Sequence, residues 1–97
     1  MEVRYANQKV ERLCTEKSQM RRKFGSEVAK KLKLRIVQLR RVESFDDLRL
    51  GLGKWEQLTG DRRGQWSAHL TPNWRLIVKD LGGNPVAVEV FEVVDYH

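Results

Sequence analysis

The sequence lacks most of the features that hold together a small secreted, membrane or metal-dependent protein. Cys14 is its only cysteine, so no disulfide can form within the chain, which fits a reducing compartment. The two histidines, His69 and His97, stand far from Cys14 and from each other, and this spacing matches no metal motif. The chain has no run of about 18 apolar residues and no apolar segment after the amino terminus. We therefore expect no metal ion, no membrane span and no secretory signal, with Cys14 as a small buried side chain.

Length and charge narrow the class further. A chain of 97 residues buries only about two thirds of its unfolded surface, so we predict one domain over residues 1–97 without a large cofactor. Nineteen Lys and Arg against thirteen Asp and Glu give a formal charge of +6. This excess favours an anionic partner such as nucleic acid, an anionic membrane surface or an acidic protein. The membrane surface is disfavoured because the basic helix lacks a large aromatic apolar face.

The first half of the chain has helical periodicity. Residues 1–5 alternate as a short strand would, and Asn7 can cap the helix that follows. The basic segment Gln19–Lys23 is expected to be a turn or a short helix. A longer helix is predicted to begin at Ser26, and residues 44–47 resemble a capping box that opens a short helix. The inner face of the longer helix carries apolar residues at steps of four and three, namely Val28, Leu32, Ile36 and Leu39.

After Gly53 the pattern becomes that of β-strands. Turn-forming residues separate four strand candidates over residues 54–58, 65–70, 74–79 and 86–94. The connections are short, so these strands should form an antiparallel meander. We predict an α+β fold in which the helices cover one face of the sheet and the other face is partly open.

Alternation within the strands predicts which side chains point away from the helices. The core-facing set is apolar: Trp66, Ala68, Leu70, Trp74, Leu76 and Val78. On the same alternation, His69, Arg75 and Lys79 lie on the open face. A basic sheet surface of this kind suits a phosphodiester, because positive donors stabilise charge on the nonbridging oxygens while an imidazole moves a proton.

The last predicted strand ends in an unusual cluster of polar side chains. Asp95, Tyr96 and His97 place a carboxylate, a phenol and an imidazole directly after an apolar run. His97 is the key member, since imidazole exchanges protons near neutral pH. The simpler alternative is a solvated chain end without chemical function.

Three separated motifs give the chain a family resemblance. Residues 58–67 (Leu-Thr-Gly-Asp-Arg-Arg-Gly-Gln-Trp-Ser), residues 73–76 (Asn-Trp-Arg-Leu) and residues 93–97 (Val-Val-Asp-Tyr-His) occur in this order. Together they resemble the HigB branch of the RelE superfamily, small bacterial toxins that are also called plasmid maintenance or killer proteins. The match covers residues 50–97 by motif and the rest by the order of elements.

The resemblance implies a RelE-like, microbial RNase-like fold and a cytoplasmic, metal-independent endoribonuclease of a type II toxin–antitoxin system. In that family the 2′-hydroxyl of messenger RNA attacks the adjacent phosphate, usually on the ribosome. A HigA-type helix-turn-helix antitoxin silences the toxin, and only through that antitoxin does the toxin reach operator DNA. The functional positions that carry over to this chain are Arg75, Asp95, Tyr96 and His97.

The proton acceptor stays open at this point. Some HigB-like sequences have His where this chain has Glu56, and many have Arg where it has His69. Either Glu56 or His69 could take the 2′-hydroxyl proton while His97 protonates the leaving 5′-oxygen. Basic residues near the motifs would add RNA affinity that falls with salt, namely Lys54, Arg62, Arg63 and Lys79. The alternative function is a noncatalytic basic module that binds RNA or a protein on the same scaffold.

Overall fold

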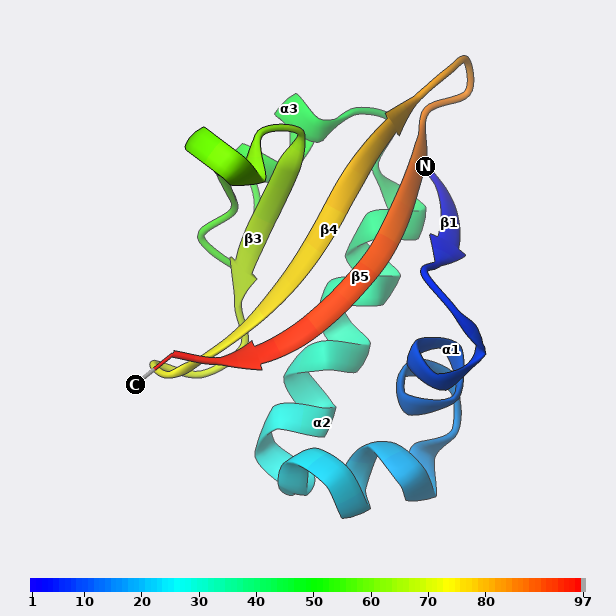
Figure 1. The fold of residues 1–97 in the computed structure, drawn as a ribbon, viewed down its shortest axis with the longest axis vertical. Helices are drawn as coiled ribbons and strands as arrows, with labels where there is room; N and C mark the ends of the chain where they lie inside the picture. The colour runs from blue at the N-terminus through cyan, green and yellow to red at the C-terminus, as the bar shows by residue number, and fades with distance from the viewer. Residues whose placement is uncertain (97) are drawn as a thin grey trace.

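The computed structural model describes residues 1–96 as helices packed on one face of a five-stranded sheet (Figure 1). The sheet order is β1-β5-β4-β3-β2. In chain order the elements are β1 (Glu2–Tyr5), α1 (Gln8–Thr15), α2 (Lys17–Arg41), α3 (Phe45–Arg49), β2 (Glu56–Gln57), the 3-10 helix η1 (Gly60–Arg62), β3 (Gln65–His69), β4 (Trp74–Gly82) and β5 (Ala87–Asp95). The predicted α+β class, with helices on one face, is confirmed.

The predicted antiparallel meander is present as strands β2 to β5. The strand expected over residues 54–58 is shorter, because only Glu56 and Gln57 pair with β3. Strand β1 pairs with β5 in parallel, with Val3 opposite Val88, and this pairing was not predicted from the sequence. Parallel neighbours cannot be joined by a tight turn, and here the helices and strands β2 to β4 all lie between β1 and β5 in the chain.

Local sequence signals explain where the helices begin and bend. The Asn7 side chain accepts a hydrogen bond of 2.9 Å from the Val10 amide and so caps α1 as predicted. Helix α2 includes the basic segment Gln19–Lys23, and it is interrupted at Gly25, where φ is 84°. That left-handed conformation is accessible to glycine at little cost. The predicted helix start at Ser26 therefore corresponds to the kink within a longer helix.

The core lies between α2 and the covered face of the sheet. All four residues of the predicted helical stripe are buried, and Leu32 and Leu39 have no exposed surface. They face Leu76 and other apolar residues of the strands within one cluster. Cys14 is 6% exposed, as predicted, and burial raises the pKa of its thiol to about 12. The thiol is thus an apolar packing group at neutral pH.

Replacement of Leu32 by alanine tests this packing. We expect Leu32→Ala to lower the free energy of unfolding by about 2–5 kcal/mol, because the lost side chain leaves a cavity. The control is Leu34→Ala on the same helix, where the leucine is 46% exposed and the expected loss is under about 1 kcal/mol. Urea denaturation measures both values. Equal losses in the two variants would contradict the assigned core.

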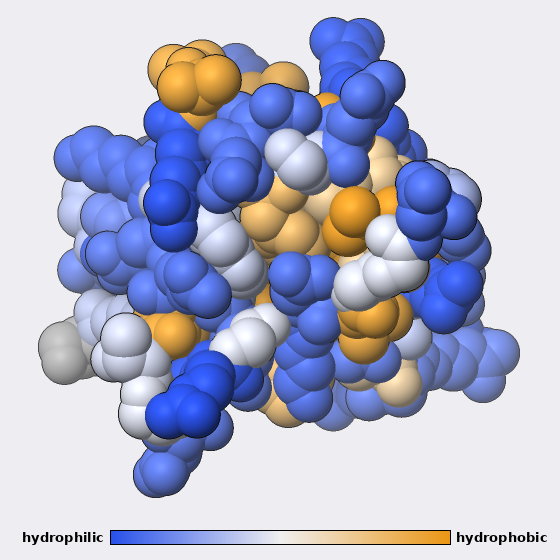
Figure 2. Space-filling view, turned by 90° about the horizontal axis from the view of Figure 1, so that it is seen from above, coloured by the Kyte–Doolittle hydropathy of each residue, from blue (hydrophilic) through white to orange (hydrophobic). Residues whose placement is uncertain are grey.

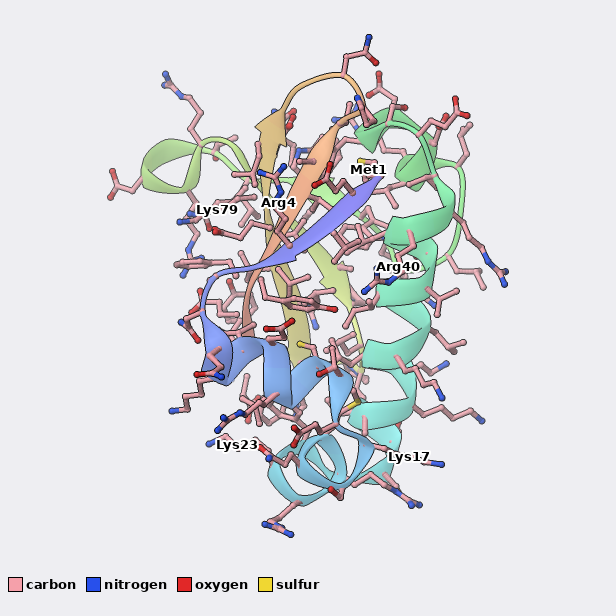
Figure 3. All side chains as sticks on the ribbon, turned by 90° about the vertical axis from the view of Figure 1, so that its right-hand side faces the viewer. Met1, Arg4, Lys17, Lys23, Arg40 and Lys79 are labelled. Carbon is pink, nitrogen blue, oxygen red and sulfur yellow. The ribbon has the colours of Figure 1, made fainter. Side chains whose placement is uncertain are left out.

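The opposite face of the sheet is only partly open. Figure 3 shows Arg4 and Lys79 on the side of the sheet away from α2, on strands β1 and β4, which lie on either side of β5. Ile77, which alternation places on this face, has no exposed surface. Arg62 also spans this face, since its Nη1 atom lies 2.9 Å from Oε1 of Gln65 on β3 and 3.0 Å from Oε1 of Glu92 on β5. Its side chain therefore passes over β4 and closes part of the face.

The molecular surface is predominantly polar at the end seen in Figure 2, where apolar atoms form smaller patches. The most exposed leucines are Leu50 and Leu52, at 88% and 78%, in the loop that follows α3. Within residues 1–96, no helix has both the length and the apolar character needed to cross a membrane.

Candidate active site on the open face

The candidate site lies where β3 ends and β4 begins. His69 and Arg75 are direct partners in the β3–β4 ladder, joined by a turn over residues 70–73. Both project from the open face, as their alternation with the buried Ala68 and Leu76 requires. Two of the predicted catalytic side chains are thus neighbours on the open face.

Arg75 is held in place by the turn itself. Its Nη1 atom donates to the carbonyl oxygens of Thr71 and Pro72, both at 2.9 Å, and of Trp74 at 3.1 Å. These contacts use one nitrogen of the guanidinium, and within residues 1–96 the other two donate no hydrogen bond. An anchored guanidinium with spare donors is suited to bind a phosphate.

The predicted carboxyl-terminal residues divide between the two sides of the sheet. Asp95 pairs with Trp74 in the ladder, so it shares the helix-facing side. Tyr96 lies on the other side, with its ring 5.9 Å from the Arg75 guanidinium carbon and its amide bonded to the Asn73 carbonyl at 2.7 Å. Tyr96 is 46% exposed and so leaves ring surface open beside Arg75. His97 lies outside the described residues, and its predicted role stays a prediction.

Lys54 and Glu56 flank His69 from the edge of the sheet. The Gly53 carbonyl accepts a hydrogen bond of 2.7 Å from the His69 amide, which ties the loop before β2 to the end of β3. Lys54 follows with φ of 49°, and both Lys54 and Glu56 are exposed. Glu56 pairs with Ser67, two residues before His69, and therefore projects from the same face.

These neighbours determine the protonation of His69. Its pKa lies below the ordinary value of 6.5, first because of burial and then because of the positive charges of Arg75 and Lys54. The carboxylate of Glu56 acts in the opposite direction. At neutral pH the imidazole is therefore uncharged, which is the state that accepts a proton.

The pKa of His69 should respond to each neighbour with a predictable sign. We expect Arg75→Ala to raise it, because a repelling charge is lost, and Lys54→Ala to raise it less. Glu56→Gln should lower it, since the favourable carboxylate charge is removed. Proton NMR titration of the imidazole measures these shifts, and His97→Gln identifies which resonance belongs to which histidine. Arg63→Ala is the control, and a shift there as large as in Arg75→Ala would contradict the local assignment.

The predicted RNA-binding residues do not all lie at this site. Lys54 adjoins His69, whereas Lys79 lies at the other end of β3, opposite Gln65, about 13 Å along the strand. The Lys79 ammonium lies 3.8 Å from the centre of the Phe91 ring. Arg62 is paired with Glu92 at 3.0 Å, so much of its charge is already compensated, and Arg63 is exposed.

Sequence reasoning missed one residue beside the site. Arg35 lies on α2 and is 6% exposed, and together with His69 and Lys54 it lines a hollow at the edge of the sheet. A signal was present, because position 35 falls three residues after Leu32 and four before Leu39, on the inner stripe. A charged residue at such a position calls for an explanation. Residues 1–96 contain no group of three or more His, Cys, Asp or Glu side chains placed to hold a metal ion.

Comparison with known proteins places this fold among bacterial toxins. No protein-family model and no curated protein matches the chain. A solved YoeB/ParE toxin from Agrobacterium tumefaciens matches it over the full length of both chains, with 20% identity and a TM-score of 0.68. A chain of a YoeB–YefM complex from Staphylococcus aureus matches all of this chain and 97% of its own length, at 16% identity and a TM-score of 0.64.

A third similar structure is YafQ from Escherichia coli, with 18% identity and a TM-score of 0.61 over 97% of this chain and 91% of that one. Sequence identities this low show a common fold. The expected RelE-like architecture is therefore confirmed, with toxins of toxin–antitoxin systems as structural neighbours.

Proposed function

We propose that this protein is the toxin of a type II toxin–antitoxin system and cleaves messenger RNA as a metal-independent endoribonuclease. The observation that carries the proposal is the pair formed by His69 and Arg75 on the open face of a toxin fold. One member is an imidazole kept neutral by its surroundings, and the other is an anchored guanidinium. A general base and a charge-stabilising donor side by side are what phosphodiester cleavage by an internal hydroxyl needs.

In the proposed cleavage reaction, His69 and Arg75 act on the 2′-hydroxyl and on the phosphate of the RNA. His69 accepts the proton of the RNA 2′-hydroxyl, and the 2′-oxygen attacks the adjacent phosphorus. Arg75 stabilises the negative charge that develops on the nonbridging oxygens. The bond from phosphorus to the 5′-oxygen breaks, leaving a 2′,3′-cyclic phosphate and a 5′-hydroxyl. By the family resemblance, His97 supplies the proton to the leaving oxygen, and Asp95 acts at the same end of the chain.

Neighbouring residues have supporting roles in this proposal. Tyr96 can stack on a base of the RNA, because its exposed ring lies beside Arg75. Glu56 is the competing candidate for the base, but it is exposed, and its charge acts on His69. Lys54, Arg63 and Lys79 would attract the RNA backbone, whereas the contribution of Arg62 is reduced by its ion pair with Glu92.

The partners follow from the same proposal. The structures similar to this chain include a YoeB–YefM toxin–antitoxin complex. We propose an antitoxin for this chain too, of the HigA helix-turn-helix type because its motifs resemble the HigB branch. We further propose that the protein acts on messenger RNA at the ribosome, in the cytoplasm, and that it reaches operator DNA only through its antitoxin.

The test is analysis of RNA ends after incubation with the purified protein. The proposal expects cuts that leave a 2′,3′-cyclic phosphate and a 5′-hydroxyl, either on free RNA or only when translating ribosomes are added. Cleavage of free RNA should be unaffected by EDTA. Substitution of the 2′-hydroxyl by hydrogen at the cut position should abolish cleavage. RNA that is bound but never cut, with or without ribosomes, would instead identify a noncatalytic binding module.

A further inference from the structure

The hollow beside His69 has a chemical character of its own. It encloses about 530 Å³ between α2, the loop before β2 and the end of β3. Its polar side chains all carry nitrogen, namely Lys31, Arg35, Lys54 and His69, and its apolar lining includes Leu52, Leu70 and Pro72. Among residues 1–96, no Asp or Glu lines it. A concave, carboxylate-free surface with three cationic side chains attracts anions.

Arg35 is the unusual member of this set. It is 6% exposed, and within residues 1–96 it forms no ion pair with a carboxylate. Burial lowers its pKa, and its Nε atom is buried without a hydrogen-bond partner. A buried charge without a counter-charge is costly to the fold. Packing alone does not explain an arginine here, since an apolar residue would fill the same inner stripe at lower cost.

The surrounding contacts hold this guanidinium in a fixed position. Nη1 of Arg35 donates to Oε1 of Gln38 at 2.8 Å, and the same oxygen accepts from Nε1 of Trp55 at 3.0 Å. The Gln38 amide nitrogen donates to the Leu52 carbonyl at 2.9 Å, which fastens the loop to the helix. Gly53 approaches so closely that a Cβ atom there would lie 2.7 Å from Nη1 of Arg35. These contacts therefore fix the position of the Arg35 guanidinium before a ligand binds.

We propose that this hollow is a second phosphate site, which holds the phosphate of a nucleotide next to the one that is cut. This inference rests on the proposed function, because His69 belongs both to the hollow and to the cleavage pair. A polynucleotide carries a phosphate at every residue, so a strand fixed at Arg75 presents another phosphate nearby. The phosphate supplies the counter-charge that Arg35 lacks. Lys31 and Lys54 contact the same anion, and exposed Leu52 offers apolar surface to the nucleoside.

Binding of an RNA strand that cannot be cut tests the site apart from catalysis. The probe is a short RNA with 2′-O-methyl groups at every ribose, and its Kd is measured at several salt concentrations. Arg35→Met should weaken binding about tenfold and lower the salt slope by about one phosphate contact. The matched control is Arg41→Met on the same helix, an exposed arginine outside the hollow, which should change Kd by less than about twofold.

Thermal unfolding separates this role from a structural one. Arg35→Met should keep or raise the Tm of the protein, because it removes an unpaired buried charge. Should that variant fail to fold, Lys31→Met replaces it, since Lys31 is exposed and lines the same hollow. The proposal is overturned when the tested variant binds the uncleavable RNA as tightly as the original protein. It is also overturned when Arg35→Met folds but has a markedly lower Tm, because the arginine is then structural.

The outcomes also distinguish this site from the nuclease. If Arg35→Met loses affinity and the original protein cleaves no RNA, the phosphate site is supported and the proposed nuclease activity is contradicted. If the original protein cleaves RNA and Arg35→Met binds the uncleavable RNA with unchanged affinity, the nuclease proposal is supported and the second phosphate site is rejected.

Discussion

Arg75→Ala is expected to lower the rate of RNA cleavage by about 10²–10³-fold, the usual cost of losing one donor that stabilises transition-state charge. The substituted side chain cannot reach a phosphate, and the ring of Tyr96 loses the cation beside it. Single-turnover cleavage of a labelled RNA measures the effect. Arrest of growth on induced expression should disappear in parallel.

Two controls show whether this loss is chemical or structural. Arg75 also donates to three turn carbonyls, each worth about 1 kcal/mol, so the Tm of Arg75→Ala must be measured alongside its rate. Arg63→Ala removes an exposed arginine of the same charge and should reduce the rate only slightly. Equal rate losses in Arg63→Ala and Arg75→Ala would mean that general charge, not a positioned donor, explains the effect.

His69→Gln is expected to reduce the cleavage rate by about 10²–10⁴-fold, the range for removal of a general base. The pH profile should change as well. A base is active when unprotonated, and the pKa of His69 is lowered, so the acid limb of the profile, the fall in rate at low pH, should begin below the ordinary histidine value of 6.5. In His69→Gln that acid limb should be absent.

Glu56→Gln separates the two candidate bases. If His69 is the base, loss of the Glu56 charge lowers the pKa of His69 further, and the acid limb moves to lower pH while the maximal rate is largely kept. If Glu56 is the base, Glu56→Gln abolishes the limb and His69→Gln retains it. Loss of the limb in Glu56→Gln together with its retention in His69→Gln would contradict the assignment of His69 as the base.

Much of the fold could be predicted because it follows from local periodicity. Asn7 as a cap, the apolar stripe of α2 and the meander after Gly53 are each encoded within a few residues. The pairing of β1 with β5 was not predictable this way, because Val3 indicates a strand but not its partner. The contact of Arg62 with Glu92 across the open face was not predictable for a similar reason, since the two residues are 30 positions apart.

For the candidate site, the sequence predicted the positions of the residues but not their protonation or their anchoring. Alternation on either side of a short turn placed His69 and Arg75 together. Their protonation and anchoring depend on contacts from elsewhere, namely the Gly53–Lys54 loop and the turn carbonyls, and sequence spacing does not reveal these. Arg35 was overlooked because its role arises only where α2 meets the end of β3.

The position of β5 has a consequence for the timing of folding. This strand lies between β1 and β4, so β1 has no partner strand until residues 87–95 have also been synthesised. Such long-range pairing is slow to form. A nascent chain that stops before this point has β1 unpaired and its sheet incomplete, so the complete sheet forms only after β5 has been translated.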